Sequence, residues 1–384
     1  MRNVFLFLCL CFSTYPKIYG QYTLRMEVKV SGDIQNDSIF IAGSFNNWDS
    51  HNVEYSLRKI AGKYIFEKQD IPKGIYEYKF TRGSWKTVEA GNSGSDIQNG
   101  VLELTSDTTI QHTIADWKDH FTPIPKPHTA SNNVHLMDSA FHMSKLNRDR
   151  KIWIYLPPGY HSGSKKYPVF YMHDGQNLFD AALSGYGEWG IDEILDSLAC
   201  LKVPESIVIG IENGTRRMNE YNPYFFEKSG AGEGDEYIDF IVNELKPYVD
   251  KHYQTLPSKE NTIIAGSSLG GLISYFAALK YPSVFGRAGI FSPAFWIAPQ
   301  ILSLTDSLAP QAKGMFFFYI GKLEGVNMMI DMNAVISKLG RSSNAFLYTI
   351  TDPTGIHNED AWRKWFPEFY LWATSNGHNH IIRQ

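Results

Sequence analysis

The chain has 384 residues, of which 43% are hydrophobic and 14% aromatic, and its formal net charge is −4 at pH 7. This length predicts two or three domains with enough apolar residues to form cores. A nearly balanced charge with no long run of one sign excludes nucleic acid and anionic membrane surfaces as the expected partners.

The first 20 residues differ from the rest of the chain. Arg2 precedes an apolar run from Val4 to Phe12, and small and polar residues follow as far as Gly20. This pattern predicts a secretory signal peptide over residues 1–20, because the run is too short to span a membrane. The mature protein would then be secreted or periplasmic and have no membrane span. A buried first strand is the alternative.

The three cysteines predict a mature protein without an internal disulfide. Cys9 and Cys11 lie inside the predicted signal peptide, so that Cys200 alone would remain after cleavage. Cys200 ends an apolar helical stretch, which predicts a buried, unreactive thiol.

Residues 21–118 alternate short β patterns with turns rich in Gly, Asn, Asp and Pro, which predicts a small all-β, immunoglobulin-like antiparallel sandwich. The expected strands are Leu24–Val30, Ser38–Ala42, Lys63–Lys68, Gly74–Thr81 and Gly100–Leu104. Residues 119–145 include the segment Phe121-Thr-Pro-Ile-Pro-Lys-Pro127 and are expected to form a linker.

Residues 146–376 alternate apolar strand patterns with helical patterns, which predicts an α/β domain with a mostly parallel sheet covered on both faces. The expected strands are Ile152–Leu156, Tyr167–Met172, Ser206–Ile211, Thr262–Gly266, Ala288–Phe291, Met315–Ile320 and Ala345–Ile350. The expected helices are Glu188–Ala199, Asp235–Tyr253, Gly271–Lys280, Ile330–Leu339 and Glu359–Ala373. Residues 377–384 read as a polar tail.

The segment Thr262-Ile-Ile-Ala-Gly-Ser-Ser-Leu-Gly-Gly271 contains the pattern Gly-x-Ser-x-Gly between a β-branched run and an apolar helical pattern. A strand, a sharp turn and a helix in this order form a nucleophile elbow, in which the serine hydroxyl is exposed at the edge of the sheet. Gly266 and Gly270 flank Ser268 where a Cβ would collide. Ser268 is therefore the expected nucleophile.

A serine hydroxyl needs a base, and in this architecture the acid and then the histidine follow the serine along the chain. His357 lies in the loop between the last predicted strand and the last predicted helix, whereas His378 and His380 fall in the polar tail. The acid should follow the strand Met315–Ile320. Glu324 is preferred, because the alternative, Asp331, falls at a predicted helix start where it would favour the helix dipole.

The tetrahedral intermediate of acyl transfer needs backbone N–H donors. One is expected from Leu269, directly after the nucleophile. The second is expected from the loop after the strand Tyr167–Met172, with Gln176 preferred and Asn177 as the alternative. The chain contains no metal-ligand spacing, phosphate loop or dinucleotide motif, so neither a metal nor a cofactor is expected.

From about residue 148 to 375 the chain resembles the putative esterase family of α/β-hydrolases, which includes esterase D, feruloyl and acetylxylan esterases and siderophore esterases. The matching segments are Trp153-Ile-Tyr-Leu-Pro-Pro-Gly159, Tyr171-Met-His-Asp-Gly175, Gly266-Ser-Ser-Leu-Gly-Gly271, Phe291-Ser-Pro-Ala-Phe-Trp296 and Gly355-Ile-His357. The resemblance implies a triad of Ser268, Glu324 and His357. The loop His-Asp-Gly-Gln departs from the His-Gly-Gly type.

Further residues are candidates for the substrate pocket. Arg217 stands among the charged and aromatic residues of a loop that follows a strand end, and Trp296 ends one of the matching segments. That loop, which also holds Arg216, Glu220 and Tyr221, has an ion-paired structural role as its alternative.

The N-terminal region resembles carbohydrate-binding module family 48, the glycogen- and starch-binding modules. The matching segments are Gly43-Ser-Phe-Asn-Asn-Trp48, Gly74-Ile-Tyr-Glu-Tyr-Lys-Phe80 and Gly83-Ser-Trp85. The resemblance implies a platform of Trp48 and Trp85 for sugar rings, with hydrogen bonds from Lys79 and Asn99. Both rings should be partly exposed and roughly coplanar. A sandwich that has lost sugar binding is the alternative.

Together these patterns predict a secreted serine esterase that acts on an acylated carbohydrate or plant-derived ester of acetyl or feruloyl type, with an N-terminal domain able to bind polysaccharide. A siderophore or small-lactone esterase, and a glycan-binding protein on a weakly active hydrolase scaffold, are the alternatives.

Overall fold

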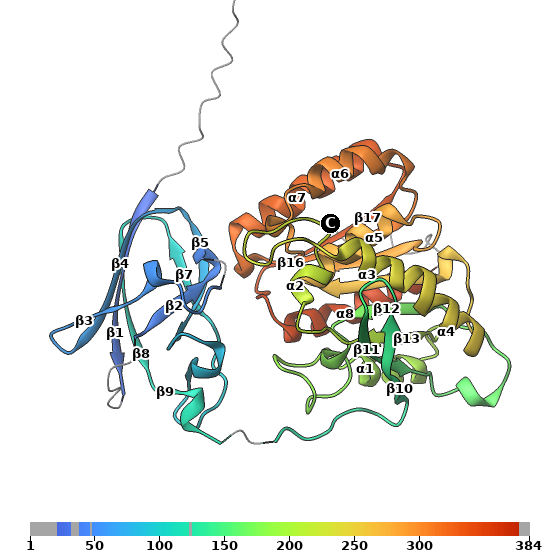
Figure 1. The fold of residues 1–384 in the computed structure, drawn as a ribbon, viewed down its shortest axis with the longest axis horizontal. Helices are drawn as coiled ribbons and strands as arrows, with labels where there is room; N and C mark the ends of the chain where they lie inside the picture. Colours follow the sequence, from blue (N-terminus) through green and yellow to red (C-terminus); the bar gives the residue numbers. More distant parts are fainter. Residues whose placement is uncertain (1–20, 32–37, 47, 123–124, 376–384) are drawn as a thin grey trace, which may run out of the picture. The chain divides into compact units, whose positions relative to one another are not determined.

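The computed structural model describes residues 21–31, 38–46, 48–122 and 125–375, which form two compact units divided after Phe121. The first unit is blue to teal and the second green to red in Figure 1. The predicted signal peptide, residues 1–20, and the polar tail, residues 377–384, lie outside the described residues.

The first unit is all-β, as expected. A four-stranded sheet has the order β3-β4-β1-β8, a three-stranded sheet the order β2-β5-β7, and β6 pairs with β9. Apolar side chains of both larger sheets, such as Met26 of β1 and Phe80 of β5, share one core. The strands are β1 Gln21–Val30, β2 Phe40–Gly43, β3 Arg58–Ile60, β4 Lys63–Pro72, β5 Gly74–Thr81, β6 Glu89–Ala90, β7 Gly100–Leu104, β8 Thr108–Ile114 and β9 Asp116–Trp117.

One pairing in this unit differs from the fully antiparallel sandwich that the sequence predicts. β1 pairs with β4 in antiparallel fashion but with β8 in parallel. The strand β8 was not among the expected strands, because its side chains alternate between half-buried and exposed positions and few of them are strongly apolar.

The second unit is built on an eight-stranded sheet with the order β10-β11-β13-β12-β14-β15-β16-β17. β10 and β11 are antiparallel to their neighbours, and the strands from β13 to β17 run parallel. The strands are β10 Val134–Met143, β11 Arg148–Tyr155, β12 Val169–His173, β13 Ile207–Ile211, β14 Thr262–Ser267, β15 Arg287–Phe291, β16 Met315–Gly321 and β17 Phe346–Asp352. β10 falls within the segment expected to be a linker, and its mixture of polar and apolar residues gave no strand signal.

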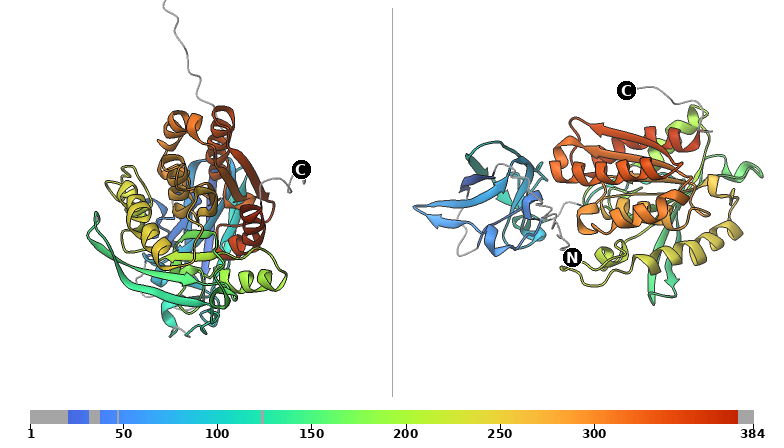
Figure 2. Two further views of the ribbon diagram at one scale, coloured as in Figure 1. Left: turned by 90° about the vertical axis from the view of Figure 1, so that its right-hand side faces the viewer. Right: turned by 90° about the horizontal axis from the view of Figure 1, so that it is seen from above.

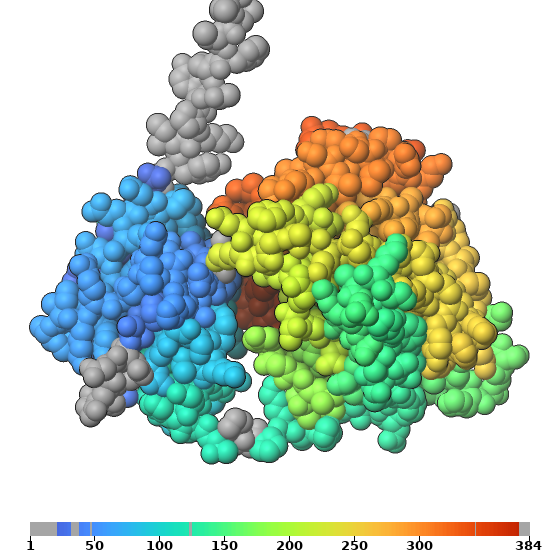
Figure 3. All heavy atoms as spheres, viewed as in Figure 1, coloured from blue at the N-terminus to red at the C-terminus, as the bar shows by residue number. Residues whose placement is uncertain are grey.

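Helices cover both faces of this sheet (Figure 2). α1 Ile191–Cys200 and α8 Glu359–Thr374 contribute side chains to the core on one face. The other face is covered by five helices, and the yellow and orange segments that include α4 and α6 lie on the side of the molecule that Figure 3 shows. They are α3 Gly234–Phe240, α4 Lys246–His252, α5 Leu269–Lys280, α6 Ile301–Leu308 and α7 Val326–Ser342.

Successive side chains of a strand point to opposite faces of the sheet, and this explains why there are two cores. In β16, Phe316 and Phe318 belong to one core, and Phe317 and Tyr319 to the other. Strands buried on both faces are therefore apolar throughout, as the sequence indicated for a parallel sheet.

One expected helix differs in detail from the prediction. The helix expected over residues 235–253 contains a π-helical turn at Ile241–Leu245 between α3 and α4. Among the described residues, none of the helices combines the length and apolar character that crossing a bilayer requires.

The expectation of a buried Cys200 is wrong, because its side chain is exposed. Cys200 is the last residue of α1, whose buried side includes Ile191 and Leu195. At about 100° per residue, Cys200 lies on the opposite side of the helix from Ile191. Hydrophobicity alone did not reveal which side of α1 would face the sheet.

Candidate active site

Ser268 occupies the turn between β14 and α5, as the sequence predicts. Its backbone has φ 58° and ψ −119°, a conformation that is costly for a residue with a side chain. Its N–H donates to the carbonyl of Phe291 at 2.9 Å, and its carbonyl accepts from Leu272 and Ala294, both at 3.0 Å. These bonds tie the strained residue to the neighbouring strand and to its own helix. The hydroxyl of Ser268 therefore stands at the carboxyl edge of the sheet.

Gly266, two residues before Ser268, packs closely against its neighbours. A Cβ on Gly266 would lie 3.0 Å from the carbonyl carbon of Gly270 and 3.0 Å from Cδ2 of His173. An alanine at this position would therefore press on the first turn of α5 and on His173.

Two residues from neighbouring loops meet at the same edge. Nδ1 of His357, between β17 and α8, lies 2.8 Å from Oε2 of Glu324, which follows β16. Glu324 is buried, with 3% of its surface exposed. Its other carboxyl oxygen accepts from the N–H of Gly321 at 2.7 Å. Glu324, and not Asp331, is therefore the acid that contacts His357.

Asp331 lies instead in the second turn of α7. Burial raises the pKa of its carboxyl group above the ordinary value. The helix begins at Val326, earlier than predicted, and this places Asp331 inside it rather than at its start.

The sequence reasoning quoted Ser292 within a motif but gave it no role. Its Oγ donates to Oε1 of Glu324 at 2.7 Å and accepts from Nε1 of Trp362 at 2.9 Å. Its backbone, like that of Ser268, has a positive φ, 44°. The ring of Trp362 in turn meets His357 edge to face at 5.1 Å. Ser292 and Trp362 thus brace the acid and the histidine together.

The loop after β12 holds Gln176 and Asn177, the two residues considered as the second oxyanion donor. Asp174 has φ 57°, and a single 3-10 turn, Gly175–Asn177, follows it. The N–H of Asn177 donates to the carbonyl of Asp174 at 2.8 Å. Among the hydrogen bonds of the described residues, none uses the backbone N–H of Gln176 or of Leu269. These two donors remain available to an oxyanion, and this favours Gln176 over Asn177.

His173 lies directly before this loop, but it is not a candidate base. It is buried, and its Nδ1 lies 2.9 Å from the hydroxyl of Tyr237. Burial lowers the pKa of His173 to about 3, so that its ring stays neutral. A neutral ring packed beside Gly266 has a structural role.

Arg217, expected to line the pocket, forms a two-point ion pair. Its Nε and Nη2 lie 2.7 and 2.8 Å from the two carboxyl oxygens of Asp174. The other charged residues of its loop pair with different partners, Arg216 with Glu233 and Glu220 with Arg150. These contacts agree with the alternative interpretation, in which the charged residues of this loop form structural ion pairs. Trp296 is half-buried and packs edge-on against Phe226, with ring centroids 6.0 Å apart.

Glu359 is a second buried carboxyl group near the site that the sequence reasoning missed. It lies two residues after His357 and accepts a hydrogen bond from Nδ2 of Asn177 at 3.3 Å. Burial raises the pKa of Glu359 to about 7, although the charges of His357 and Arg217 oppose this effect. The signal available in the sequence was only its closeness to His357.

The residues expected to bind sugar lie in the first unit. The rings of Trp48 and Trp85 have centroids 6.1 Å apart, and their planes are inclined by 42°. Trp48 is half-buried and Trp85 is 40% exposed. Partial exposure therefore agrees with the prediction, but the prediction of coplanar rings is wrong. Each ring is placed by its own loop, so no shared sheet surface aligns them.

The two expected polar partners of the sugar are engaged within the protein. Nζ of Lys79 donates to the carbonyl of Ile97, and burial lowers the pKa of this amine. Nδ2 of Asn99 donates to Oε2 of Glu77 at 2.9 Å. A sugar would have to compete for these donors.

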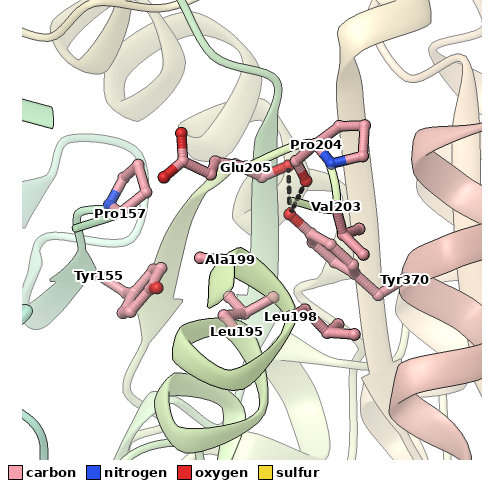
Figure 4. Close-up of a pocket in the computed structure, with 10 residues that line it drawn as sticks. Tyr155, Pro157, Leu195, Leu198, Ala199, Val203, Pro204, Glu205 and Tyr370 are labelled. Carbon is pink, nitrogen blue, oxygen red and sulfur yellow. Dashed lines mark hydrogen bonds between the residues drawn. The ribbon is translucent and has the colours of Figure 1, made fainter. Parts of the chain in front are cut away.

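A small pocket between α1 and α8 lies elsewhere (Figure 4). Tyr155 and Leu195 line it, and the hydroxyl of Tyr370 donates to the carbonyl of Pro204 at 2.7 Å. Tyr155 pairs with Val208 near the start of β13, so this pocket is at the amino edge of the parallel strands, opposite Ser268.

No group of three or more His, Cys, Asp or Glu side chains suited to a metal ion occurs among the described residues.

Comparisons with known proteins agree with this geometry. The protein family described as "Putative esterase" matches residues 143–369, more than half of the chain. "Uncharacterized protein YbbA" of Bacillus subtilis (strain 168) is 32% identical over 185 residues, which cover 46% of this chain and 70% of that protein. The "Endo-1,4-beta-xylanase/feruloyl esterase" of Xylanibacter ruminicola is 26% identical over 208 residues, which cover 52% of this chain and only 27% of that protein.

Among solved structures, the enterobactin esterase FES from Shigella flexneri resembles this chain with a TM-score of 0.53. The sequences are 17% identical, and the match covers 88% of each chain. At this identity the likeness shows a common fold.

Proposed function

Because the chain belongs to the family described as "Putative esterase" and is a carboxylic ester hydrolase, we propose that Ser268, His357 and Glu324 hydrolyse the ester through an acyl-enzyme. The observation that carries this proposal is the 2.8 Å contact between His357 and Glu324 at the sheet edge where the elbow presents Ser268. The contact fixes the proton of His357 on Nδ1 and leaves Nε2 as the base.

In the first half of the reaction, Oγ of Ser268 attacks the ester carbonyl carbon and Nε2 of His357 accepts the hydroxyl proton. Glu324 stabilises the imidazolium that forms. The negative charge on the carbonyl oxygen is met by the N–H groups of Leu269 and Gln176. Collapse of the intermediate expels the alcohol, which takes the proton from His357.

In the second half, His357 removes a proton from water, and the resulting hydroxide attacks the acyl group on Ser268. The same two N–H groups stabilise the second oxyanion. Collapse releases the carboxylic acid and returns the proton to Oγ of Ser268. No redox or metal step enters this sequence.

The proposed substrate is an acylated carbohydrate or plant-derived ester of acetyl or feruloyl type, met outside the cell after secretion. Two observations support this class. The relative from Xylanibacter ruminicola carries feruloyl esterase in its name and matches 52% of this chain. The half-exposed Trp48 and exposed Trp85 are a surface on which sugar rings can stack.

A substrate panel tests this proposal. Purified full-length protein is assayed with an aryl acetate, acetylated xylan, methyl ferulate and a catecholate trilactone, each beside Ser268→Ala. We expect acetyl or feruloyl esters to be hydrolysed with the higher kcat/KM. Ser268→Ala should lose several orders of magnitude in activity on each active substrate. Preference for the trilactone would overturn the substrate class, and a Ser268→Ala variant with more than about a tenth of wild-type activity would overturn the nucleophile.

A further inference from the structure

The loop that offers the N–H of Gln176 has one short hydrogen bond of its own, from the N–H of Asn177 to the carbonyl of Asp174, but the side chain of Asp174 has its partners outside the loop. It leaves β12 through the positive φ of Asp174, which a residue other than glycine adopts only at a cost of about 1–3 kcal/mol. It also packs tightly, because a Cβ on Gly175 would lie 2.6 Å from the carbonyl carbon of Gly210 in β13. Other parts of the structure must therefore keep Asp174 in place.

The segment that follows β13 supplies these contacts. Both carboxyl oxygens of Asp174 accept from Arg217, and Oδ1 also accepts from Nδ2 of Asn213 at 2.6 Å. The N–H of Asp174 donates to the hydroxyl of Tyr221 at 3.2 Å. The backbone N–H of Asn213 donates to Oε1 of Gln176 at 3.2 Å. One segment thus holds the oxyanion loop at Asp174 and at Gln176.

This segment is itself anchored to the sheet. Arg150 of β11 donates to both carboxyl oxygens of Glu220 at 2.8 Å, and both side chains are buried. Arg148 of β11 contacts Glu220 and Glu233. These ion pairs fix the short helix α2, Arg217–Glu220, which carries the guanidinium.

Asp174 and Arg217 both stay charged, and this stabilises the ion pair between them. Burial acts to raise the pKa of Asp174, but the charge and hydrogen bonds of Arg217 outweigh it and hold that pKa below its ordinary value. The guanidinium of Arg217 also lies over the ring of Tyr221, 5.2 Å from its centroid. A planar guanidinium makes both contacts at once, which a lysine amine does not.

We propose that Arg217 is a positioning residue, which clamps Asp174 so that the N–H of Gln176 points at the developing oxyanion. This inference rests on the proposed function. The ion pair contributes to the transition state through the loop and not by touching the substrate. A shift of about 1 Å in a positioned group can cost about 100-fold in rate.

The test compares Arg217→Gln and Arg217→Lys with Arg216→Gln. Arg216 is the adjacent residue, and its pair with Glu233 is more exposed, so it is a matched control. For each variant we measure kcat and KM on an aryl acetate, the inhibition constant of an aryl trifluoromethyl ketone, and thermal unfolding. The ketone forms a tetrahedral oxyanion on serine and therefore reports the oxyanion site separately from substrate binding.

For Arg217→Gln we expect kcat to fall about 100-fold with KM nearly unchanged, and the ketone to bind more weakly by a similar factor. Arg217→Lys should recover part of both losses, and Arg216→Gln should stay within about twofold of wild type. If Arg217→Gln does not fold, Asp174→Asn, which retains the shape of the side chain, carries the same test.

A higher KM with unchanged kcat would show that Arg217 binds substrate and would overturn the clamp. An unaffected Arg217→Gln variant beside an inactive Ser268→Ala variant would overturn the clamp alone. Activity in Ser268→Ala would overturn the proposed function, and the clamp with it.

Discussion

Ser292 donates a hydrogen bond of 2.7 Å to Glu324, through the carboxyl oxygen that His357 does not use. The acid is thus held from both sides, by the histidine that it orients and by a buried serine whose own position is fixed by Trp362. The backbone of Ser292 also adopts a positive φ of 44°. Strain of this kind persists only where surrounding contacts enforce it, and it is typical of functional sites.

Ser292→Ala should reduce kcat by about tenfold or more, because a hydrogen bond to a charged group is worth about 1.5–3 kcal/mol. The variant also leaves the buried indole N–H of Trp362 without its acceptor, so its free energy of unfolding should fall by about 1–3 kcal/mol. Steady-state kinetics and urea unfolding measure the two effects. Wild-type kcat in a destabilised Ser292→Ala protein would show that the serine serves folding alone.

Glu324→Gln should lower kcat by about three to four orders of magnitude, because an amide favours the wrong tautomer of His357. Asp331→Asn is the matched control: it makes the same chemical change at the other candidate acid, which lies in α7. Its kcat should stay within about twofold of wild type. A larger loss in Asp331→Asn than in Glu324→Gln would reverse the assignment.

Glu359 makes stability depend on pH near neutrality. Its pKa is 4.5 in the ordinary state and is raised to about 7 by burial in the folded protein. Between these values the folded protein holds a proton that the unfolded chain has released. The free energy of unfolding therefore falls as the pH rises from about 5 to 7, by at most about 1.4 kcal/mol per pH unit for this group. Glu359→Gln should flatten that slope in urea unfolding experiments.

Two further variants serve as controls for this slope. Burial raises the pKa of Asp192 to about 7 as well, so Asp192→Asn should remove a separate part of the same dependence. Asp352 behaves oppositely: burial acts to raise its pKa, but hydrogen bonds from Lys364 and Trp365 hold it below the ordinary value. Its contribution is lost only in acid, so Asp352→Asn should lower stability without changing the slope from pH 5 to 7. An unchanged slope in Glu359→Gln would contradict the prediction.

The first unit should bind polysaccharide through Trp48 and Trp85. Each stacked sugar ring is worth about 1 kcal/mol, so binding should be weak and visible mainly on polymers. In affinity electrophoresis through soluble α-glucan or xylan, the full-length protein should be retarded, and the variant with both tryptophans changed to alanine should not. Lys86→Ala, a change at an exposed neighbour of Trp85, is the control. Equal mobility of all three proteins would leave the unit without a role in glycan binding.

The architecture and the central site residues follow from local sequence signals. A β-branched run, Gly-x-Ser-x-Gly and an apolar helix are contiguous, so the elbow at Ser268 could be predicted from one segment. His357 and Glu324 were predicted because each stands downstream of Ser268 in a loop after an expected strand, and parallel strands bring their carboxyl ends to one edge. The strands β8 and β10 were missed because their half-exposed side chains give weak patterns.

Other features depend on contacts between distant segments, which a single sequence does not encode locally. The side of α1 that faces the sheet decided that Cys200 is exposed. The inclination of Trp48 against Trp85 was set by two separate loops. The partners of Arg217 and Ser292 are 43 and 32 residues away in the chain, and only the packing of the sheet brings them together. The sequence by itself determined which residues are candidates for the chemistry, because their signals are local. The tertiary structure decided which partners hold Glu324 and Asp174 in place, because those contacts join distant segments.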